Sequence, residues 1–519
     1  MVILTLPKHG SGMTSRLSIR PRSASSLGCA MLVVVGILLT AISQADAAVL
    51  NAQSVSLADV RAAVALATDG DTVIIPAGTA SWTNALNYSV AITLQGSGVG
   101  VTIIKDDAPG AENNNSGCIN VTTTAGKPYR ITGIEFQPGV RTQELSKGCV
   151  ALRGFSHSVR VDHCKITANT NRCLTVWDWV LGVCDHVDFY ANNEVVHVAH
   201  GSWGNSDGTG DGSWTSDSTL GTADAFYIED FTVTSSVPGL DIGVCDSEFG
   251  ARWVVRHGAV TGGQIGSHGT EGGVDRSTRQ FEVYDVAFIT TNINPNAIHC
   301  RGGSGVYFNN TAIGYGNFAT LNCYRGAQTY PIWGVASGFN PWDSNQSGGP
   351  FWSGTYFGPN GAVTMTDTSQ TWSTNELLGY SLTNVTSGRS SSIMSHNAHT
   401  ITQWHEASQD GMMTFHNGDA YEIWKVNAAL DMPGMGKGDA MNRSTPAWPN
   451  EIIEGIYAWD NTLDGSTSAA LMVSRKYPFI REGIHYFNQT QKPGYTPFTY
   501  PHPLTRPAPP TNLRVIAGP

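Results

Sequence analysis

The chain has 519 residues, of which 58 are glycine, and only 14% are charged. Its 30 Lys and Arg residues are outnumbered by 41 Asp and Glu residues, which gives a formal net charge of −11. This acidic balance argues against nucleic acid and anionic membranes as partners, because both are negatively charged. An acidic polysaccharide is still compatible, since a local basic patch can lie on an acidic body.

The N-terminus has the pattern of an export signal. Four Lys or Arg residues fall within the first 22 positions, an apolar run follows from Ala30 to Ile42, and Ala45-Asp46-Ala47 has the small-x-small pattern of a cleavage site. We therefore expect residues 1–47 to be a signal peptide and the protein to be secreted or displayed at the cell surface. The apolar run is shorter than the roughly 20 residues of a membrane span, so we expect no span in the mature chain.

Eight cysteines follow residue 47. In an oxidising compartment their even number permits disulfides, but no CxxC pair indicates a zinc or redox site. We favour buried, stacked thiols over disulfides. The eight are Cys118, Cys149, Cys164, Cys173, Cys184, Cys245, Cys300 and Cys323.

The first elements after the signal are a short helix and a series of short strands. Ser56 can cap a helix from Leu57 to Ala67, because apolar residues recur there on one face. Strands are expected at 72–75, 91–94 and 101–104, separated by Gly-rich and Asp-rich turns. A helix placed before many short strands is typical of the protected end of a solenoid.

A six-residue phrase then recurs along the chain. It alternates apolar and polar residues and turns at Asn, Asp, His or Gly, which is the pattern of one strand and one corner. Successive starts differ by 23, 44, 27, 28 and 25 residues, and we interpret the 44 as two coils. The sequence therefore predicts an all-β fold, a parallel β-helix. The phrase starts at Val161, Cys184, Ile228, Val255, Val283 and Phe308.

The phrase disappears between residues 359 and 433, where four strand-like segments predict a small inserted β-module. It returns at Ile456, and a Pro-rich C-terminus follows. We expect the β-helix at 48–358, the module at 359–433, the β-helix end with a closing strap at 434–504, and a linker or further module at 505–519.

Three stretches resemble the pectate-lyase-like superfamily of right-handed parallel β-helix proteins. They are the opening Thr68-Asp-Gly-Asp-Thr-Val-Ile-Ile-Pro-Ala-Gly78, the next coil Gln95 to Ile104, and Val161-Asp-His-Cys164. The resemblance implies a right-handed β-helix and a polysaccharide partner. The chain lacks the R-x-P-x-x-R motif of pectate lyases and the catalytic set of polygalacturonases, so no catalytic residue of either family is carried over.

Aligned phrases place equivalent residues in ladders about 4.8 Å apart. The second position holds Asp162, Asp185 and Glu229, and we expect these to face outward because their neighbours are apolar. Stacked carboxylates repel one another, so we predict that Ca²⁺ or Arg256 offsets them; a solvated acidic face is the alternative. The third position, beginning with His163, is expected to be a polar corner ladder.

The stretch from 246 to 301 concentrates ionisable residues and is the predicted active site. Elimination from a uronic-acid polymer needs a cation to neutralise the substrate carboxylate and a base to remove the adjacent proton. We expect His268 to be the base, because arginine is a poor one. The predicted catalytic set is Arg256, His268, Arg279 and Glu282, and the predicted substrate-binding set is Arg252, Arg301, Trp203 and Trp214.

Three functions fit these features. We favour a polysaccharide lyase that acts by β-elimination on an acidic glycan. The alternatives are a non-catalytic cell-surface or carbohydrate-binding protein, and an inverting hydrolase of the polygalacturonase type. For the hydrolase, ladder carboxylates two coils apart, such as Asp162 and Glu229, would give a separation near the required 6.5–9.5 Å. We expect a monomer.

Overall fold

A computed structural model gives the structure of the chain over most of its length. It describes residues 47–108, 117–140, 148–168, 172–191, 194–200, 217–235, 244–269, 277–323, 350–374, 376–378, 380–403, 413–424, 432–436, 453–475 and 480–506. The predicted signal peptide lies almost wholly outside these residues, as do Trp203 and Trp214. No helix among the described residues is long and apolar enough to cross a membrane.

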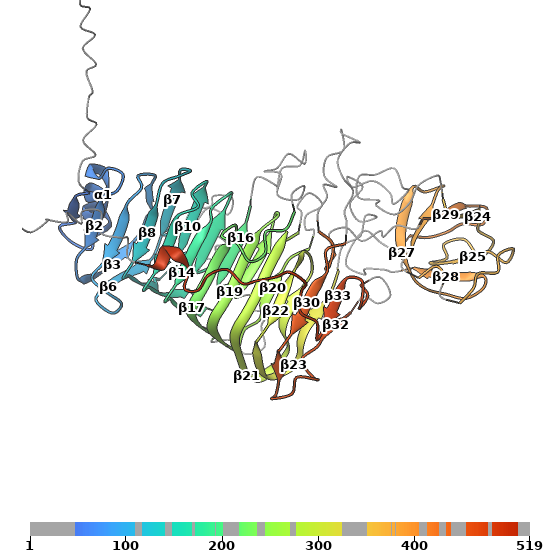
Figure 1. Ribbon diagram of the computed structural model, residues 1–519. Helices are drawn as coiled ribbons and strands as arrows, with labels where there is room; N and C mark the ends of the chain where they lie inside the picture. The colour runs from blue at the N-terminus through green and yellow to red at the C-terminus, as the bar shows by residue number, and fades with distance from the viewer. Residues whose placement is uncertain are drawn as a thin grey trace, which may run out of the picture. The chain divides into compact units, whose positions relative to one another are not determined.

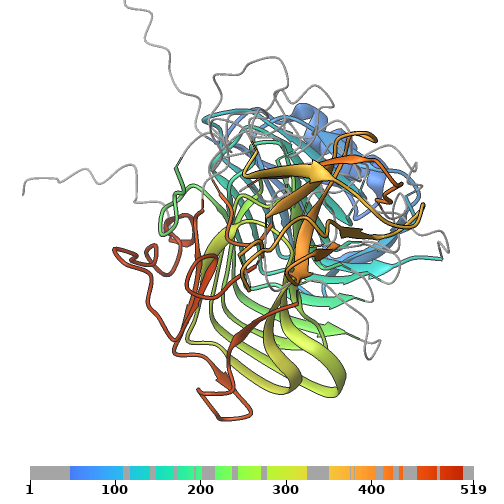
Figure 2. The ribbon, with the colours of Figure 1, turned by 90° about the vertical axis from the view of Figure 1, so that its right-hand side faces the viewer.

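The main body is a right-handed parallel β-helix. Its strands pair in parallel with the strands of the preceding and following coils, and each coil contributes to three faces. Figure 1 shows the strands side by side from β2 to β33, and Figure 2 shows successive coils one behind another. The predicted fold class is confirmed.

The three faces are built from short strands, and β17, β19, β21 and β23 each continue over more than one face. The first face contains β1 (Val49–Asn51), β2 (Thr72–Ile75), β5 (Thr93–Gly96), β8 (Tyr129–Thr132), β11 (Val159–Asp162), β14 (Gly182–Asp185), β17 (Phe226–Ser235), β19 (Arg252–Thr261), β21 (Gln280–Cys300), β22 (Ser304–Phe308), β30 (Ile456–Trp459) and β33 (Tyr486–Asn488). The second face adds β3 (Gly78–Trp82), β6 (Thr102–Asp106), β9 (Glu135–Pro138), β12 (Lys165–Ala168), β15 (Asp188–Ala191), β23 (Thr311–Leu321) and β31 (Thr462–Leu463). The third face contains β4 (Leu86–Tyr88), β7 (Ile119–Thr123), β10 (Val150–Gly154), β13 (Leu174–Trp177), β16 (Val196–Ala199), β18 (Cys245–Glu248), β20 (Ile265–Ser267) and β32 (Met472–Ser474).

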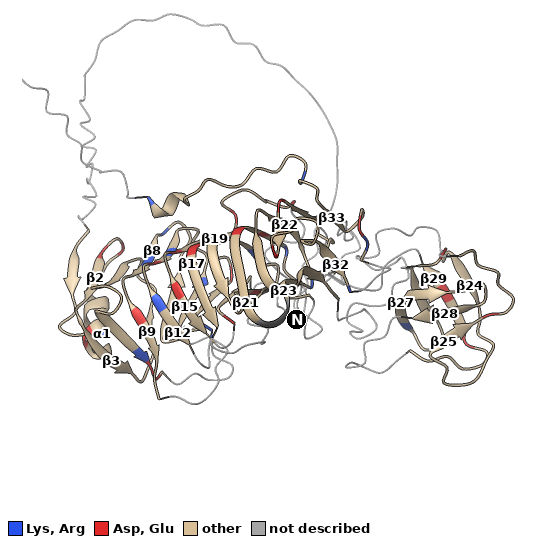
Figure 3. Cartoon of the chain, turned by 90° about the horizontal axis from the view of Figure 1, so that it is seen from below, with Lys and Arg blue, Asp and Glu red and all other residues tan. Residues whose placement is uncertain are grey.

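The core forms because side chains alternate between the inside and the outside of each strand. On the first face the inward position is filled by Val161, Cys184, Ile228, Val255 and Val283, all of which are completely buried. All eight cysteines after residue 47 are buried and unpaired, as predicted. Figure 3 shows that both acidic and basic residues occur on neighbouring strands of the β-helix.

The corner between the first and second faces is a ladder of residues in the left-handed conformation. Their φ angles lie between 50° and 56°, a region that Asn, Asp and His tolerate better than other non-glycine residues. This explains the polar third position of the repeated phrase. The ladder consists of His163, His186, Asp230, His257, Asp285, Asn309 and Asp460.

Two details of the predicted register are wrong. The interval of 44 residues is one enlarged coil, because β14 pairs directly with β17 and Asp185 lies opposite Glu229. The phrase at Phe308 is shifted by one residue, because Val283 pairs with Tyr307. The corner residue of that coil is therefore Asn309, and Asn310 is buried.

The N-terminal end of the β-helix is covered by helix α1 (Leu57–Leu66). The Ser56 side chain caps it by accepting a hydrogen bond of 3.2 Å from the backbone N–H of Asp59. Its Val60, Ala63 and Val64 side chains are buried. The predicted cap is therefore present.

An antiparallel β-module interrupts the coils. It begins earlier than residue 359, because its first strand starts at Trp352 and pairs with β29. It has its own core, which includes Met365, Leu382 and Ile423. Its strands are β24 (Trp352–Thr355), β25 (Thr364–Thr366), β26 (Ser381–Asn384), β27 (Arg389–His396), β28 (Thr400–Gln403) and β29 (Ala420–Trp424).

The C-terminal strap, residues 489–506, returns along the outside of the first face and ends in the 3-10 helix η3 (Pro503–Thr505). It runs in Figure 1 as a red segment past β19 to β14. The His502 N–H donates to Glu229, and the Thr505 carbonyl accepts from Arg160. The strap thus continues to Arg506 and is longer than the predicted 434–504 boundary allows.

Candidate functional site

The outer surface of the third face carries a cluster of ionisable side chains. Strand alternation explains their position: Val196 and Val198 point into the core, so His197 between them points outward. Asp246 lies opposite His197 on β18. The third-face cluster consists of Glu194, His197, Asp246, Glu248 and His268.

Glu194 and Asp246 form a pair of neighbouring carboxyl groups. Burial and the charge of Asp246 raise the pKa of Glu194 to about 7, and the two side chains share a hydrogen bond. Two carboxylates in contact cannot both ionise easily, so one holds the proton. Here Glu194 holds it, even though Arg172 contacts the same carboxyl group. Glu194 is therefore a proton donor that titrates near neutrality.

Asp246 also pairs with His268. The Asp246 Oδ2 atom lies 2.9 Å from His268 Nε2. Burial alone would raise the pKa of Asp246, but the charge of His268 and their hydrogen bond hold it below its usual value. Burial alone would lower the pKa of His268, but Asp246 outweighs it and raises that pKa. The pair is an imidazole oriented and made more basic by a carboxylate.

His197 is buried inside the cluster. It is 1% exposed, and neither ring nitrogen has a hydrogen-bond partner among the described residues. Its Nδ1 lies 3.7 Å from Glu194 Oε2 and its Nε2 lies 3.5 Å from Glu248 Oε1. Burial lowers the pKa of His197, so the ring is neutral at physiological pH. A neutral imidazole between carboxylates can act as a metal ligand.

Glu194, His197 and Asp246 fit a divalent ion, because one ligand atom from each lies within 4.8 Å of the others. One imidazole nitrogen and two carboxylates suit Mn²⁺, Fe²⁺ or Zn²⁺ better than Ca²⁺, which prefers oxygen ligands.

We expect such an ion to bind more tightly as the pH rises to about 7, because it must displace the proton of Glu194. Calorimetric titration with Mn²⁺ at two pH values measures this. His197→Ala is expected to weaken binding at least about tenfold by removing one of three ligands, whereas His163→Ala, in the other group that could hold an ion, should leave it unchanged. Equal affinity in both variants would contradict the assignment.

Arg301 lies one coil beyond His268. Backbone hydrogen bonds from His268 N to Ser247 O and from Arg301 N to Ser267 O place Glu248, His268 and Arg301 at equivalent positions on successive coils. The Arg301 charge is close enough to act on the pKa of His268. The structure thus brings together two of the predicted site residues, His268 and Arg301.

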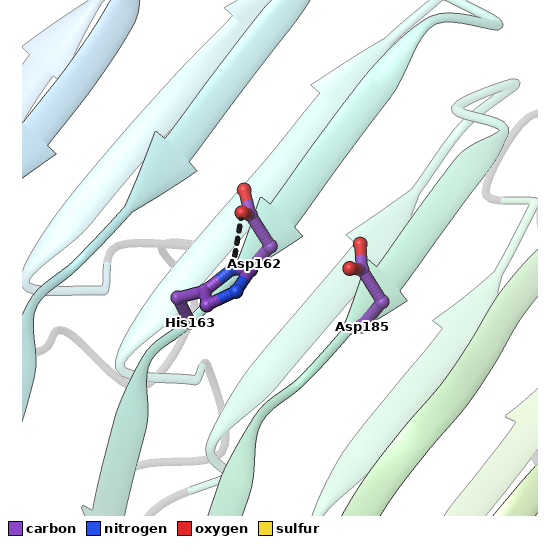
Figure 4. Close-up of side chains that lie close together, drawn as sticks. All are labelled: Asp162, His163 and Asp185. Carbon is purple, nitrogen blue, oxygen red and sulfur yellow. Dashed lines mark hydrogen bonds and ion pairs between the residues drawn. The ribbon is translucent and has the colours of Figure 1, made fainter. Parts of the chain in front are cut away.

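The ladder of Asp162, Asp185 and Glu229 lies on the first face. Figure 4 shows Asp162 and Asp185 on adjacent strands, with His163 bonded to Asp162 at 2.7 Å. All three carboxylates are fully buried, so the expected solvated acidic face is wrong. The C-terminal strap and a row of arginines cover them.

Arginines offset the charge of this ladder. Arg130 binds Asp162 through two bonds of 2.7 and 2.6 Å, and Arg160 binds Asp185 through two bonds of 2.8 Å. These bonds occupy carboxylate oxygens that Ca²⁺ would need. The calcium assignment to Asp162, Asp185 and Glu229 stays a prediction.

The other predicted catalytic residues make structural contacts away from the third-face cluster. Arg256 is fully buried on the first face, pairs with Glu229, and donates hydrogen bonds to the strap carbonyls of Phe498 and Thr499. Glu282 on the same face accepts a 2.5 Å hydrogen bond from the Tyr495 hydroxyl of the strap. Neither side chain can reach a polysaccharide while the strap is in place.

Arg279 and Arg252 are also engaged within the protein. Arg279 is fully buried and pairs with Glu454 at 2.6 Å. The Arg252 Cζ atom lies 5.7 Å from the centroid of the Trp179 ring, and Arg252 Nη1 donates a hydrogen bond to the Thr219 hydroxyl. We therefore leave Arg256, Arg279, Glu282 and Arg252 out of the proposed site, while Trp203 and Trp214 lie outside the described residues.

Sequence reasoning missed Glu194 and His197. The repeated phrase belongs to the first and second faces, so it gave no register for the third face. A usable signal was the alternation Val196-His197-Val198, in which a histidine occupies the outward position of an apolar strand.

No family model matches the chain, and no curated protein matches it. Three solved structures with partial similarity are two lyases and a methylesterase. An alginate lyase from Paenibacillus sp. is 13% identical, with 52% of this chain and 97% of that chain covered and a TM-score of 0.30. A PL6 family polysaccharide lyase from Pseudopedobacter saltans is 11% identical, with 53% and 65% covered and a TM-score of 0.33. A pectin methylesterase variant in complex with a hexasaccharide is 11% identical, with 47% and 89% covered and a TM-score of 0.29. These scores are too low to transfer a substrate or a site.

Proposed function

We propose that the protein is a secreted, carbohydrate-active enzyme that cleaves an acidic polysaccharide by β-elimination at the third-face cluster. The observation that carries this proposal is the chain of contacts from Glu194 to Asp246 to His268. On one side of Asp246 lies a carboxyl group whose pKa is raised to about 7, and on the other side lies an imidazole at 2.9 Å. Arg301 on the next coil adds the cation that the reaction needs.

Each residue has a role in the proposed reaction. Arg301 neutralises the carboxylate of a uronic acid residue, which makes the neighbouring C–H more acidic. Neutral His268 removes that proton, and Asp246 stabilises the imidazolium that forms. The electron pair forms a C=C bond, the glycosidic C–O bond breaks, and Glu194 gives its proton to the departing oxygen. A divalent ion held by Glu194, His197 and Asp246 would displace the proton of Glu194, so it has no part in this reaction.

The residues of the site favour elimination over inverting hydrolysis. Inverting hydrolases hold two carboxyl groups about 6.5–9.5 Å apart, with a water molecule between them. Glu194 and Asp246 offer ligand atoms within 4.8 Å of each other and share a hydrogen bond. Asp162 and Glu229, two coils apart, are buried in ion pairs. A non-catalytic binding protein would not need an acid with a pKa close to neutrality.

The reaction is tested by incubating the protein with pectin, alginate and neutral glycans. Elimination raises both the ultraviolet absorbance of unsaturated products and the number of reducing ends, whereas hydrolysis raises reducing ends alone. We expect both signals with an acidic glycan, and the same result with EDTA present, because Arg301 supplies the essential cation. Silence on every acidic glycan in the panel would contradict the proposal.

We expect a bell-shaped dependence of kcat/KM on pH. His268 must be neutral to act as a base, so the rate rises as the pH passes through the raised pKa of this imidazole. Glu194 must be protonated to act as an acid, so the rate falls above about pH 7. Glu194→Gln is expected to lower the rate and remove the falling limb. A falling limb that persists in Glu194→Gln would assign the acid to another group.

A further inference from the structure

A pocket of about 550 Å³ lies between the C-terminal strap and the first face, separate from the third-face cluster. Its floor is the outward row Thr93, Arg130 and Arg160, which are paired on successive strands. Leu504, Thr505 and Arg506 of the strap line its other side. The remaining lining residues are Gly70, Ala91, Ile92, Pro128, Tyr129, Ser158 and His163.

The lining is basic on one part and apolar on another. It includes Arg130, Arg160 and Arg506, and no Asp or Glu is among the described lining residues. Asp162 and Asp185, which pair with two of these arginines, lie buried beneath them. Arg130 donates to Asp162 from only two of its three nitrogens, and Arg506 adds a third positive charge to the lining.

The buried carboxylates orient these arginines. Arg130 binds Asp162 through Nε and Nη2, so its Nη1 lies outside that pair. Arg160 binds Asp185 in the same way and donates from Nη1 to the Thr505 carbonyl of the strap at 3.3 Å. A planar guanidinium fixed in this manner is suited to bind a second anion, because little side-chain freedom is lost on binding.

We propose that this strap pocket binds the carboxylate of a small acidic sugar, a mono- or disaccharide that contains a uronic acid. The volume is within the range of small-molecule sites. Pro128 and Leu504 provide apolar surface that the face of a sugar ring can cover, and the arginines bind the carboxylate. The anion preference stands on the pocket alone, whereas the choice of a sugar rests on the proposed function.

The test is calorimetric titration of the full protein with galacturonic acid and mannuronic acid, with glucose as the neutral sugar and sodium sulfate as the anion without a ring. Arg506→Gln removes an exposed cation that has no ion pair with any carboxylate among the described residues, so it should fold normally. Arg130→Gln removes the guanidinium group on the floor of the pocket. Each is expected to weaken uronate binding about tenfold or more, the loss of one charge-assisted pair. Lys127→Gln, beside the pocket but outside its lining, is the matched control and should bind normally.

Thermal unfolding of each variant shows whether a loss of binding reflects a loss of fold. Unchanged uronate binding in both Arg506→Gln and Arg130→Gln would overturn the proposal, as would equal binding of glucose. Sulfate binding as tight as uronate binding would overturn the sugar assignment. His268→Ala should bind uronate at the strap pocket normally, so an absence of elimination activity and an absence of pocket binding are separate results.

Discussion

Replacement of His268 by alanine is expected to reduce kcat for elimination by about 10²–10⁴-fold, the usual contribution of a general base. The imidazole is positioned by Asp246 at 2.9 Å and is one coil from Arg301. Its loss leaves the proton acceptor position empty while the other charges remain. Initial rates of unsaturated product formation on an acidic glycan measure the effect.

Two controls separate a chemical role for His268 from a structural one. His186→Ala removes a half-exposed histidine from the corner ladder of another face and should leave kcat unchanged. Free imidazole should restore part of the activity of His268→Ala, since a small base can enter the space left by the side chain. Full activity in His268→Ala, or a loss of equal size in His186→Ala, would refute the assignment of the base.

Replacement of Arg256 by methionine is expected to destabilise the protein by about 3–5 kcal/mol, because it leaves the Glu229 carboxylate buried without its partner. Both side chains are fully buried, and the Arg256 Nε atom donates to Glu229 Oε2 at 2.7 Å. The change also removes two hydrogen bonds to the strap. Urea denaturation followed by tryptophan fluorescence measures the loss.

The double variant Arg256→Met with Glu229→Gln tests the cause. Because the second change removes the unpaired charge, it should recover a large part of the lost stability. Activity per folded molecule should be near normal in both variants, since the pair lies on a different face from the third-face cluster. A loss of kcat without a loss of stability would instead restore Arg256 to the catalytic set.

The fold could be predicted from the sequence because its repeat is local. The six-residue phrase contains the inward apolar positions and the polar corner residue, and both follow from strand alternation and from the tolerance of His, Asp and Asn for positive φ. The enlarged coil before Ile228 and the one-residue shift at Phe308 were missed, because the spacing between repeats does not tell a long loop from an additional coil.

The site could be predicted only in part. His268 and Arg301 stand out because they lie in a segment rich in ionisable residues. Arg256 stands out for the same reason, yet it pairs with Glu229 beneath a strap that is 242 residues further along the chain. No pattern near Arg256 reveals such a distant cover. Likewise, His197 joins Asp246 only through the register of β16 and β18, and the repeated phrase does not report on that face.

The strap also has a consequence for how the protein unfolds. In a solenoid each coil contacts only its neighbours, so stability spreads along the stack and the ends can fray independently. Here Arg160 and Thr505 are bonded across 345 residues of sequence, and His502 and Glu229 across 273. These bonds tie the strap to several coils at once, whereas each coil otherwise contacts only the coil before it and the coil after it. Coils between β11 and β21 should therefore exchange their amide hydrogens as one cooperative unit, and that unit can be complete only after the last residues of the strap have been synthesised.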